Sequence, residues 1–99
     1  AAFSEYAVIS QNALVKIDPK IPFEVAALFG CAVVTGVGSV VNTANVSPGE
    51  SVAIVGLGGV GLNALLASIA SGAGRVIAVD VEEKKLKIAS QLGAHNTFN

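Results

Sequence analysis

The glycine-rich stretch at residues 56–61, with the sequence GLGGVG, constrains the fold of this 99-residue chain more than any other feature. It directly follows residues 51–55, a short run rich in β-branched side chains that is typical of a buried strand. Leucine and isoleucine then recur at helical spacing until residues 71–74 (SGAG) end the pattern. The sequence therefore predicts a strand, a tight glycine turn and a helix in direct succession.

A second strand and a second helix follow the first pair. Residues 76–79 (VIAV) predict a buried strand that ends at Asp80, and Glu82 and Glu83 follow where carboxylates complement a helix N-terminus. Gly93 stands where a left-handed C-cap belongs, and residues 97–99 predict the start of a third strand. Because parallel sheets are normally buried on both faces, continuous apolar strands favour an α/β fold with a partial, Rossmann-type parallel sheet and flanking helices.

Each glycine of the loop has a separate predicted task. Gly56 permits the tight turn, Gly58 lets the backbone approach a pyrophosphate, and Gly61 permits close packing of the helix against the strand. The helix beginning near Gly59 and Val60 offers free N–H groups and a positive end, which can hold a diphosphate without a basic side chain. These five residues are the predicted cofactor-binding loop.

Asp80 lies nineteen residues after the last glycine of the loop, at the end of the next strand. An acidic residue there is the expected acceptor for the adenosine ribose hydroxyls, and its charge would repel a 2′-phosphate, which favours NAD over NADP. The alternative is that Asp80 only caps the following helix and that the glycines form an ordinary turn. The order of strand, loop, helix, strand and acid favours the dinucleotide site.

The first part of the chain has a different pattern. Residues 3–9 and 13–17 predict two short strands around a polar turn, and residues 18–22 contain two prolines that break regular structure. From Phe23 to about Ala44 the pattern predicts two consecutive helices with a tight junction at Gly30. We place the domain division between residues 1–21 and residues 22–99, where short strands give way to alternating helix and strand.

Composition excludes several classes of function. The formal charge of −1 gives no electrostatic basis for binding nucleic acid. A single cysteine, Cys31, and a single histidine, His95, cannot supply the three or four ligands of a usual metal site, and a reducing, cytoplasmic setting fits best. Residues 25–49 and 51–74 lack charge, but the glycines and polar side chains within them argue against membrane spans. The chain has no methionine, and we expect it to be a fragment of a longer product without a signal peptide.

Three stretches together resemble the zinc-dependent medium-chain alcohol dehydrogenases: residues 30–36 (GCAVVTG), residues 56–61, and residues 79–85 with their acid and paired lysines. The resemblance extends across all 99 residues, since residues 3–8 and 14–17 are similar to the end of that family's catalytic domain. It implies that residues 1–21 are the edge of a catalytic domain and residues 22–99 part of an NAD-binding Rossmann domain.

The resemblance also assigns roles to three side chains. It implies that Cys31 is a ligand of the catalytic zinc, that Thr35 packs beside the nicotinamide, and that Lys85 lies near the adenosine ribose. Without it, a lone cysteine on an apolar helix is more often a buried structural residue, and Lys85 a solvated lysine on an amphipathic helix. For His95 a surface position without a ligand is the favoured interpretation. Val34 departs from the threonine often found at its position in the family.

The resemblance implies hydride transfer between a small-molecule alcohol or aldehyde and NAD(H), with zinc polarising the substrate oxygen. We expect a homo-oligomer, without nucleic-acid or membrane partners. The 99 residues alone are expected to be inactive, because a catalytic zinc needs three protein ligands. Alternatives are a glutathione-dependent formaldehyde dehydrogenase of the same superfamily, a zinc-free quinone or enoyl reductase, which Cys31 disfavours, and a non-catalytic nucleotide-binding module.

Overall fold

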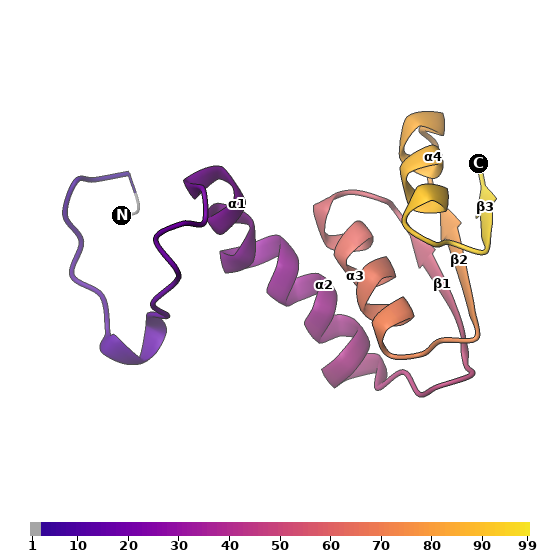
Figure 1. Cartoon of the computed structure of the whole chain (residues 1–99), viewed down its shortest axis with the longest axis horizontal. Helices are drawn as coiled ribbons and strands as arrows, with labels where there is room; N and C mark the ends of the chain where they lie inside the picture. Colours follow the sequence, from indigo (N-terminus) through magenta and orange to yellow (C-terminus); the bar gives the residue numbers. More distant parts are fainter. Residues whose placement is uncertain (1–2) are drawn as a thin grey trace.

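The computed structural model describes residues 3–99 and has an elongated shape of 45 × 29 × 24 Å. Figure 1 shows three parts in chain order: an extended arm, a long oblique helical segment, and a compact unit in which helices pack on a sheet. The arm carries one short 3₁₀ turn, η1 (Gln11–Ala13). The compact unit holds the glycine-rich loop, so it is the part that positions the candidate site.

The sheet has three parallel strands in the order β1-β2-β3: β1 (Ser51–Val55), β2 (Arg75–Val79) and β3 (Asn96–Phe98). Helix α3 (Gly59–Ala70) connects β1 to β2, and α4 (Glu83–Gln91) connects β2 to β3. This confirms the predicted Rossmann-type parallel sheet with flanking helices. The second and third strands each begin one residue earlier than predicted.

The core lies between the sheet and one layer of helices. Helix α3 packs on β1 and β2, while α4 packs on β2 and β3. The buried side chains of this layer belong to Ile54, Leu57, Leu65, Val76, Ala78, Leu86 and Ala89. Helices and strands thus bury one face of the sheet through the alternation of side chains along each strand.

The opposite face of the sheet is largely uncovered along β1 in this chain, which corrects the prediction that residues 51–55 form a buried strand. Val55 is 81% exposed, and Ile54 is the one residue of β1 that is buried. The physical reason is that α3 and α4 both pack on the same face, so alternate residues of β1 meet no covering layer.

The segment from Phe23 to Ala44 is one continuous helical run. It consists of α1 (Phe23–Leu28), the π-helical turn η2 (Phe29–Val33), α2 (Val34–Gly38) and the π-helical turn η3 (Ser39–Ala44). The predicted junction at Gly30 is therefore wrong. A glycine inside a helix costs only about 1 kcal/mol, which the apolar helical sequence on both sides outweighs.

This helical run contacts the compact unit through Gly36, which is buried. A Cβ atom added at Gly36 would collide with the Val60 carbonyl oxygen and lie 2.7 Å from Asn63 Cβ. The run is also long and apolar enough to cross a membrane, judged by length and composition only. A core helix of a soluble protein passes the same test, so this finding alone is weak evidence for a membrane span.

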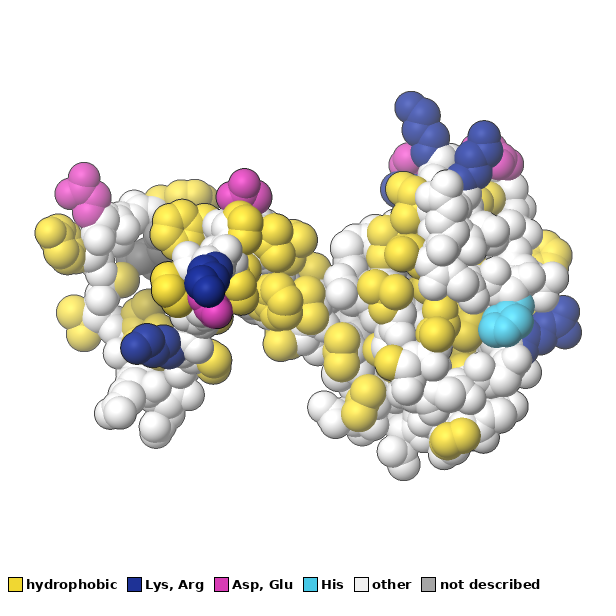
Figure 2. Space-filling view, in the orientation of Figure 1, with side chains coloured by type: hydrophobic (Ala, Val, Ile, Leu, Met, Phe, Trp, Pro, Cys, Tyr) yellow, Lys and Arg dark blue, Asp and Glu magenta, His cyan; other side chains and the backbone are white. Residues whose placement is uncertain are grey.

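The arm does not form the strands predicted at residues 3–9 and 13–17. Between residues 3 and 22 the described chain contains η1 and no strand, and every residue from 3 to 20 is exposed. Figure 2 shows its apolar side chains on the surface. A strand needs a hydrogen-bonded neighbour, and the arm lies against none. The division between residues 1–21 and 22–99 stays a prediction, and residues 1 and 2 lie outside the described structure.

Candidate dinucleotide-binding site

The loop between β1 and α3 turns back sharply at Gly56. Gly56 has φ +91°, a left-handed conformation that disfavours any side chain, and its N–H donates to the Val79 carbonyl at 2.8 Å. The loop is thereby attached to the end of β2. The predicted tight turn at Gly56 has the geometry that requires glycine.

Gly61 and Gly58 differ in what a side chain would meet. A Cβ atom at Gly61 would collide with the Gly56 carbonyl oxygen and lie 2.9 Å from its carbonyl carbon. A Cβ atom at Gly58 would meet nothing within 4 Å. The fold itself therefore requires glycine at position 61, where the loop closes on its own helix. At position 58 the fold leaves open space, as a close-approaching ligand would need.

The N-terminus of α3 is uncapped by any side chain. The first helical hydrogen bond runs from the Leu62 N–H to the Gly58 carbonyl at 2.9 Å. The N–H groups of Gly59, Val60 and Gly61 precede that bond and have no partner within the helix. Together with the positive end of the helix dipole, these donors suit the diphosphate of a dinucleotide.

Asp80 fixes the loop from the neighbouring strand. Its Oδ2 accepts the Leu57 N–H at 2.6 Å, and its Oδ1 accepts the Glu82 N–H at 2.9 Å. The two N–H groups, that of Leu57 first, hold the pKa of the Asp80 carboxyl below its usual value, with a smaller contribution from Lys85. Asp80 thus bonds to the residue that precedes α4, as the capping alternative requires. The hydrogen bond to the Leu57 N–H holds the glycine loop, and capping of α4 alone does not explain it.

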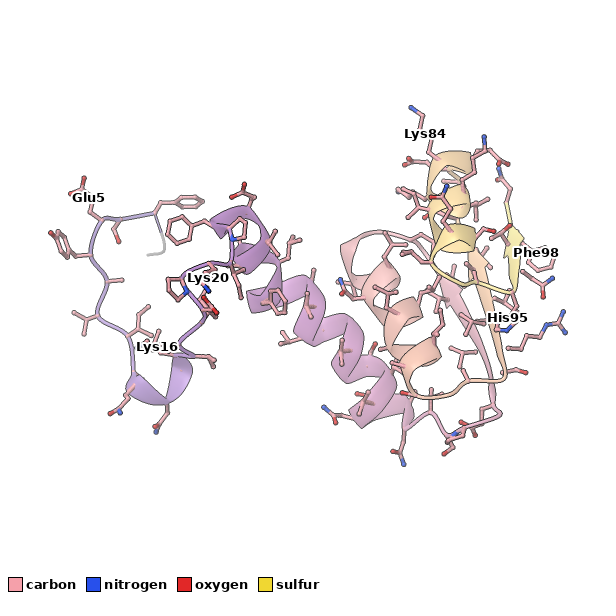
Figure 3. The ribbon with its side chains drawn as sticks, in the orientation of Figure 1. Glu5, Lys16, Lys20, Lys84, His95 and Phe98 are labelled. Atoms are coloured by element: carbon pink, nitrogen blue, oxygen red, sulfur yellow. The ribbon has the colours of Figure 1, made fainter. Side chains whose placement is uncertain are left out.

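Lys85 lies at this carboxylate. Its Nζ is 3.0 Å from Glu82 Oε1 and 3.8 Å from Asp80 Oδ1. The Glu82 carboxylate, with help from Asp80, holds the pKa of the Lys85 ammonium above its usual value. By contrast, Lys84 projects away from α4 in Figure 3. The pairing of Lys85 with Glu82 was not predicted from the sequence, although their i, i+3 spacing was the available signal.

An open cleft of about 590 Å³ adjoins the loop. It extends along β1 toward η3, and residues of the loop line one end of it. The lining side chains are mostly small and apolar, among them Val40, Ala44, Val46, Val52 and Ala64, and Ser39 adds one hydroxyl. The cleft therefore offers a largely apolar surface beside the backbone groups of the glycine loop, and Asp80 lies outside its lining.

Cys31 and Thr35 lie one helical turn apart, and both are exposed. Ala32, which lies between them, is close to the loop: a Cβ atom added at Gly59 would lie 3.3 Å from the Ala32 Cβ. The helix carrying Cys31 is thus in contact with the start of α3. Within residues 3–99 no three His, Cys, Asp or Glu side chains are grouped so that they could hold a metal ion. Cys31 could supply one zinc ligand, and its partners would have to come from elsewhere.

His95 contributes to the sheet and has no metal partner among the described residues. Its Nδ1 accepts the Val76 N–H at 3.0 Å, and its own N–H donates to the Val76 carbonyl at 2.8 Å. His95 directly precedes β3, and Figure 3 shows its side chain on the sheet side of the α/β unit. The sequence predicts a surface position without a ligand role for His95, but this hydrogen bond depends on tertiary structure and was not predicted.

A parallel sheet in the order β1-β2-β3, joined through a glycine turn and two helices on one face, defines half of a Rossmann-type nucleotide-binding domain. A zinc-binding-domain alcohol dehydrogenase protein from Burkholderia ambifaria superimposes with a TM-score of 0.79 at 38% identity, over 86% of this chain and 23% of that one. Residues 59–99 match the family model described as zinc-binding dehydrogenase.

Relatives at higher identity agree with this class. Alcohol dehydrogenase B of Mycobacterium tuberculosis is 52% identical over 96 residues, which are 97% of this chain and 26% of that protein. The S-(hydroxymethyl)glutathione dehydrogenase of Synechocystis is 46% identical over all 99 residues, or 27% of its own length. The chain is therefore similar to the zinc-dependent medium-chain alcohol dehydrogenases, and it spans about a quarter of the length of these relatives.

Proposed function

We propose that the protein carrying this sequence transfers hydride between a small-molecule alcohol and NAD, with a bound zinc ion. The main observation in support is the hydrogen bond from the Leu57 N–H to Asp80 Oδ2 at 2.6 Å, because it holds an ionised carboxylate against the glycine loop. The match of residues 59–99 to the zinc-binding dehydrogenase family model and the names of the relatives support an oxidoreductase. We also propose a cytoplasmic location and a homo-oligomer.

The dinucleotide part of the proposal uses groups that the chain already presents. The free N–H groups of Gly59, Val60 and Gly61 would receive the diphosphate, and the open space at Gly58 allows the close approach. Asp80 would accept hydrogen bonds from the adenosine ribose, with Lys85 at its side. A carboxylate with a lowered pKa is ionised at neutral pH, so it would disfavour a 2′-phosphate.

The zinc part of the proposal uses Cys31 and Thr35. Zinc, when bound, would act as a Lewis acid on the substrate oxygen. Cys31 would supply one thiolate, and its exposed position leaves it accessible to further ligands. Thr35 lies one turn further along the same helix, where it could pack beside the nicotinamide. Contact between Ala32 and the loop would keep both residues close to the dinucleotide.

A glutathione-dependent formaldehyde dehydrogenase is the second candidate function. The match to the S-(hydroxymethyl)glutathione dehydrogenase of Synechocystis over the whole chain favours it. The dinucleotide loop, Asp80 and Cys31 would act in the same way in both enzymes. Assays with a simple alcohol and with S-(hydroxymethyl)glutathione distinguish the two functions. If the protein binds NAD but turns over neither substrate, a non-catalytic module is favoured.

The proposed cofactor choice is tested with the Asp80→Ser variant. NAD and NADP affinities are measured by calorimetry for the unmodified protein and for the variant. We expect the unmodified protein to prefer NAD and the variant to lose that preference, because the ribose acceptor and its negative charge are gone. Asp18→Ser, in the exposed arm, is the control. An unchanged preference in Asp80→Ser would show that Asp80 has another role.

A further inference from the structure

A second carboxylate lies beside Asp80, outside the glycine motif. Glu82 stands two residues after Asp80, and its side chain is 59% exposed. Its Oε1 is 3.0 Å from Lys85 Nζ, whereas Asp80 Oδ1 is 3.8 Å from the same nitrogen. The closer ion-pair partner of Lys85 is therefore Glu82.

The position of Lys85 matters because a cation is the usual means of accepting a 2′-phosphate in dinucleotide sites. Here the ammonium is already engaged by two carboxylates. Asp80, Glu82 and Lys85 together carry a net charge of −1 when all three are ionised. A phosphate carries about −1.5 to −2 charges at neutral pH, so this group of three side chains would repel it.

We propose that Glu82 is a specificity-determining residue, which holds the Lys85 ammonium and thereby keeps a 2′-phosphorylated dinucleotide out of the site. The inference rests on the proposed function, which places the adenosine ribose at Asp80. Asp80 would accept the ribose hydroxyls, while Glu82 pairs with the Lys85 ammonium and neutralises its charge. The two carboxylates thus act against the 2′-phosphate by different routes.

The Glu82→Gln substitution isolates this charge. The Glu82 N–H, which Asp80 Oδ1 accepts at 2.9 Å, stays in place because it belongs to the backbone. The side chain is largely exposed, so the variant is expected to fold. Glu83→Gln is the matched control, since Glu83 is the neighbouring glutamate and the first residue of α4, and its Oε1 accepts from Asn99 Nδ2 at 3.3 Å.

The experiment measures NAD and NADP dissociation constants by calorimetry for the unmodified protein, Glu82→Gln and Glu83→Gln. We expect Glu82→Gln to reduce discrimination against NADP about fivefold at low ionic strength, and less as salt is added. Glu83→Gln should leave the ratio of the NADP and NAD dissociation constants unchanged. NMR titration of the lysine side chain should show a lower Lys85 pKa in Glu82→Gln only.

The outcomes distinguish an error in the role proposed for Glu82 from an error in the proposed function. An unchanged ratio in Glu82→Gln, with relaxed cofactor choice in Asp80→Ser, would overturn the role of Glu82 and leave the dinucleotide site intact. Equal effects of Glu82→Gln and Glu83→Gln would also overturn it, because general surface charge would then account for the change. Failure of the unmodified protein to bind either dinucleotide would overturn both the proposed function and this inference.

Discussion

The arm at residues 3–22 and the α/β unit at residues 46–99 both contain short apolar runs, yet they have opposite structures. In the α/β unit such runs pair as parallel strands, and Val76 and Leu65 are fully buried. In the arm, Val8 and Val15 are almost entirely exposed and no ladder forms among the described residues. The difference teaches that strand-forming composition becomes a strand only where the chain also supplies a neighbour.

The α/β unit supplies these neighbours through its own topology. Strands β1 and β2 are each followed by a helix that returns the chain to the adjacent position, so β1 pairs with β2 from Ser51↔Arg75 to Val55↔Val79. The arm has no such return segment between residues 3 and 22. Substitutions in the two regions should therefore have very different effects.

The largest effect is expected from Gly61→Ala. The new Cβ would collide with the Gly56 carbonyl, a backbone group that cannot rotate away, so we expect a loss of about 4 kcal/mol in the free energy of unfolding. Gly58→Ala, where the Cβ meets open space, should change stability by less than about 1 kcal/mol and weaken NAD binding instead. Urea unfolding and calorimetry check the two halves. Equal stability of both variants would contradict the assigned difference.

The next effect compares a core leucine with an arm leucine. Leu65→Ala removes a fully buried side chain and should cost about 3 kcal/mol. Leu14→Ala changes a side chain that is 58% exposed in the arm and should cost less than about 0.5 kcal/mol. Chemical denaturation of both variants measures the contrast. A large cost for Leu14→Ala would mean that the arm packs on something in solution.

A smaller effect is expected at His95. His95→Phe removes the acceptor for the Val76 N–H and should cost about 1 kcal/mol. His95→Asn, which can present an oxygen near the position of Nδ1, is the conservative control. Hydrogen exchange of the Val76 amide gives a local readout, and faster exchange is expected in the Phe variant only. Identical exchange in all three proteins would rule out the role of this bond.

The smallest effect is expected for Asp80→Asn, and it is a change of stability with pH. Because the folded-state pKa of Asp80 is lowered, its stabilising contribution is present above the unfolded value of about 4 and is lost as pH falls through the lower folded value. The stability gap between the unmodified protein and Asp80→Asn should therefore narrow in acid. Denaturation without dinucleotide, from about pH 7 to about pH 3, measures it. A gap that does not change with pH would show that the charge of Asp80 is not what stabilises the loop.

Prediction from the sequence succeeded where the local pattern and the tertiary contacts favour the same structure. The strands, helices and glycine turn of the α/β unit follow from periodicity and from the glycines, and the position of Asp80 directly after β2 follows from the predicted end of that strand. It failed at the arm strands and at the bare face of the sheet, because both depend on which segments pack nearby. It also failed at Gly30, where the propensities of the neighbouring residues outweigh one glycine.

The candidate site shows the same division. The loop glycines and Asp80 could be named from the sequence, whereas the pairing of Lys85 with Glu82 needed side-chain positions. The hydrogen bond from Val76 to His95 joins residues that only the folded sheet brings together. Distances across elements are decided by packing, and a single sequence does not encode them in a local pattern.

The closure of the loop on its own helix, at Gly56 and Gly61, has a kinetic consequence. Leu57 is bonded to Asp80, Gly56 to Val79 and Leu62 to Gly58, so the donors at the start of α3 are already held in place. A diphosphate arriving there would find its partners preformed, and little chain entropy would be lost on ordering them. Association would then be limited by how often the ligand meets the site in the correct orientation, not by a rearrangement of the loop.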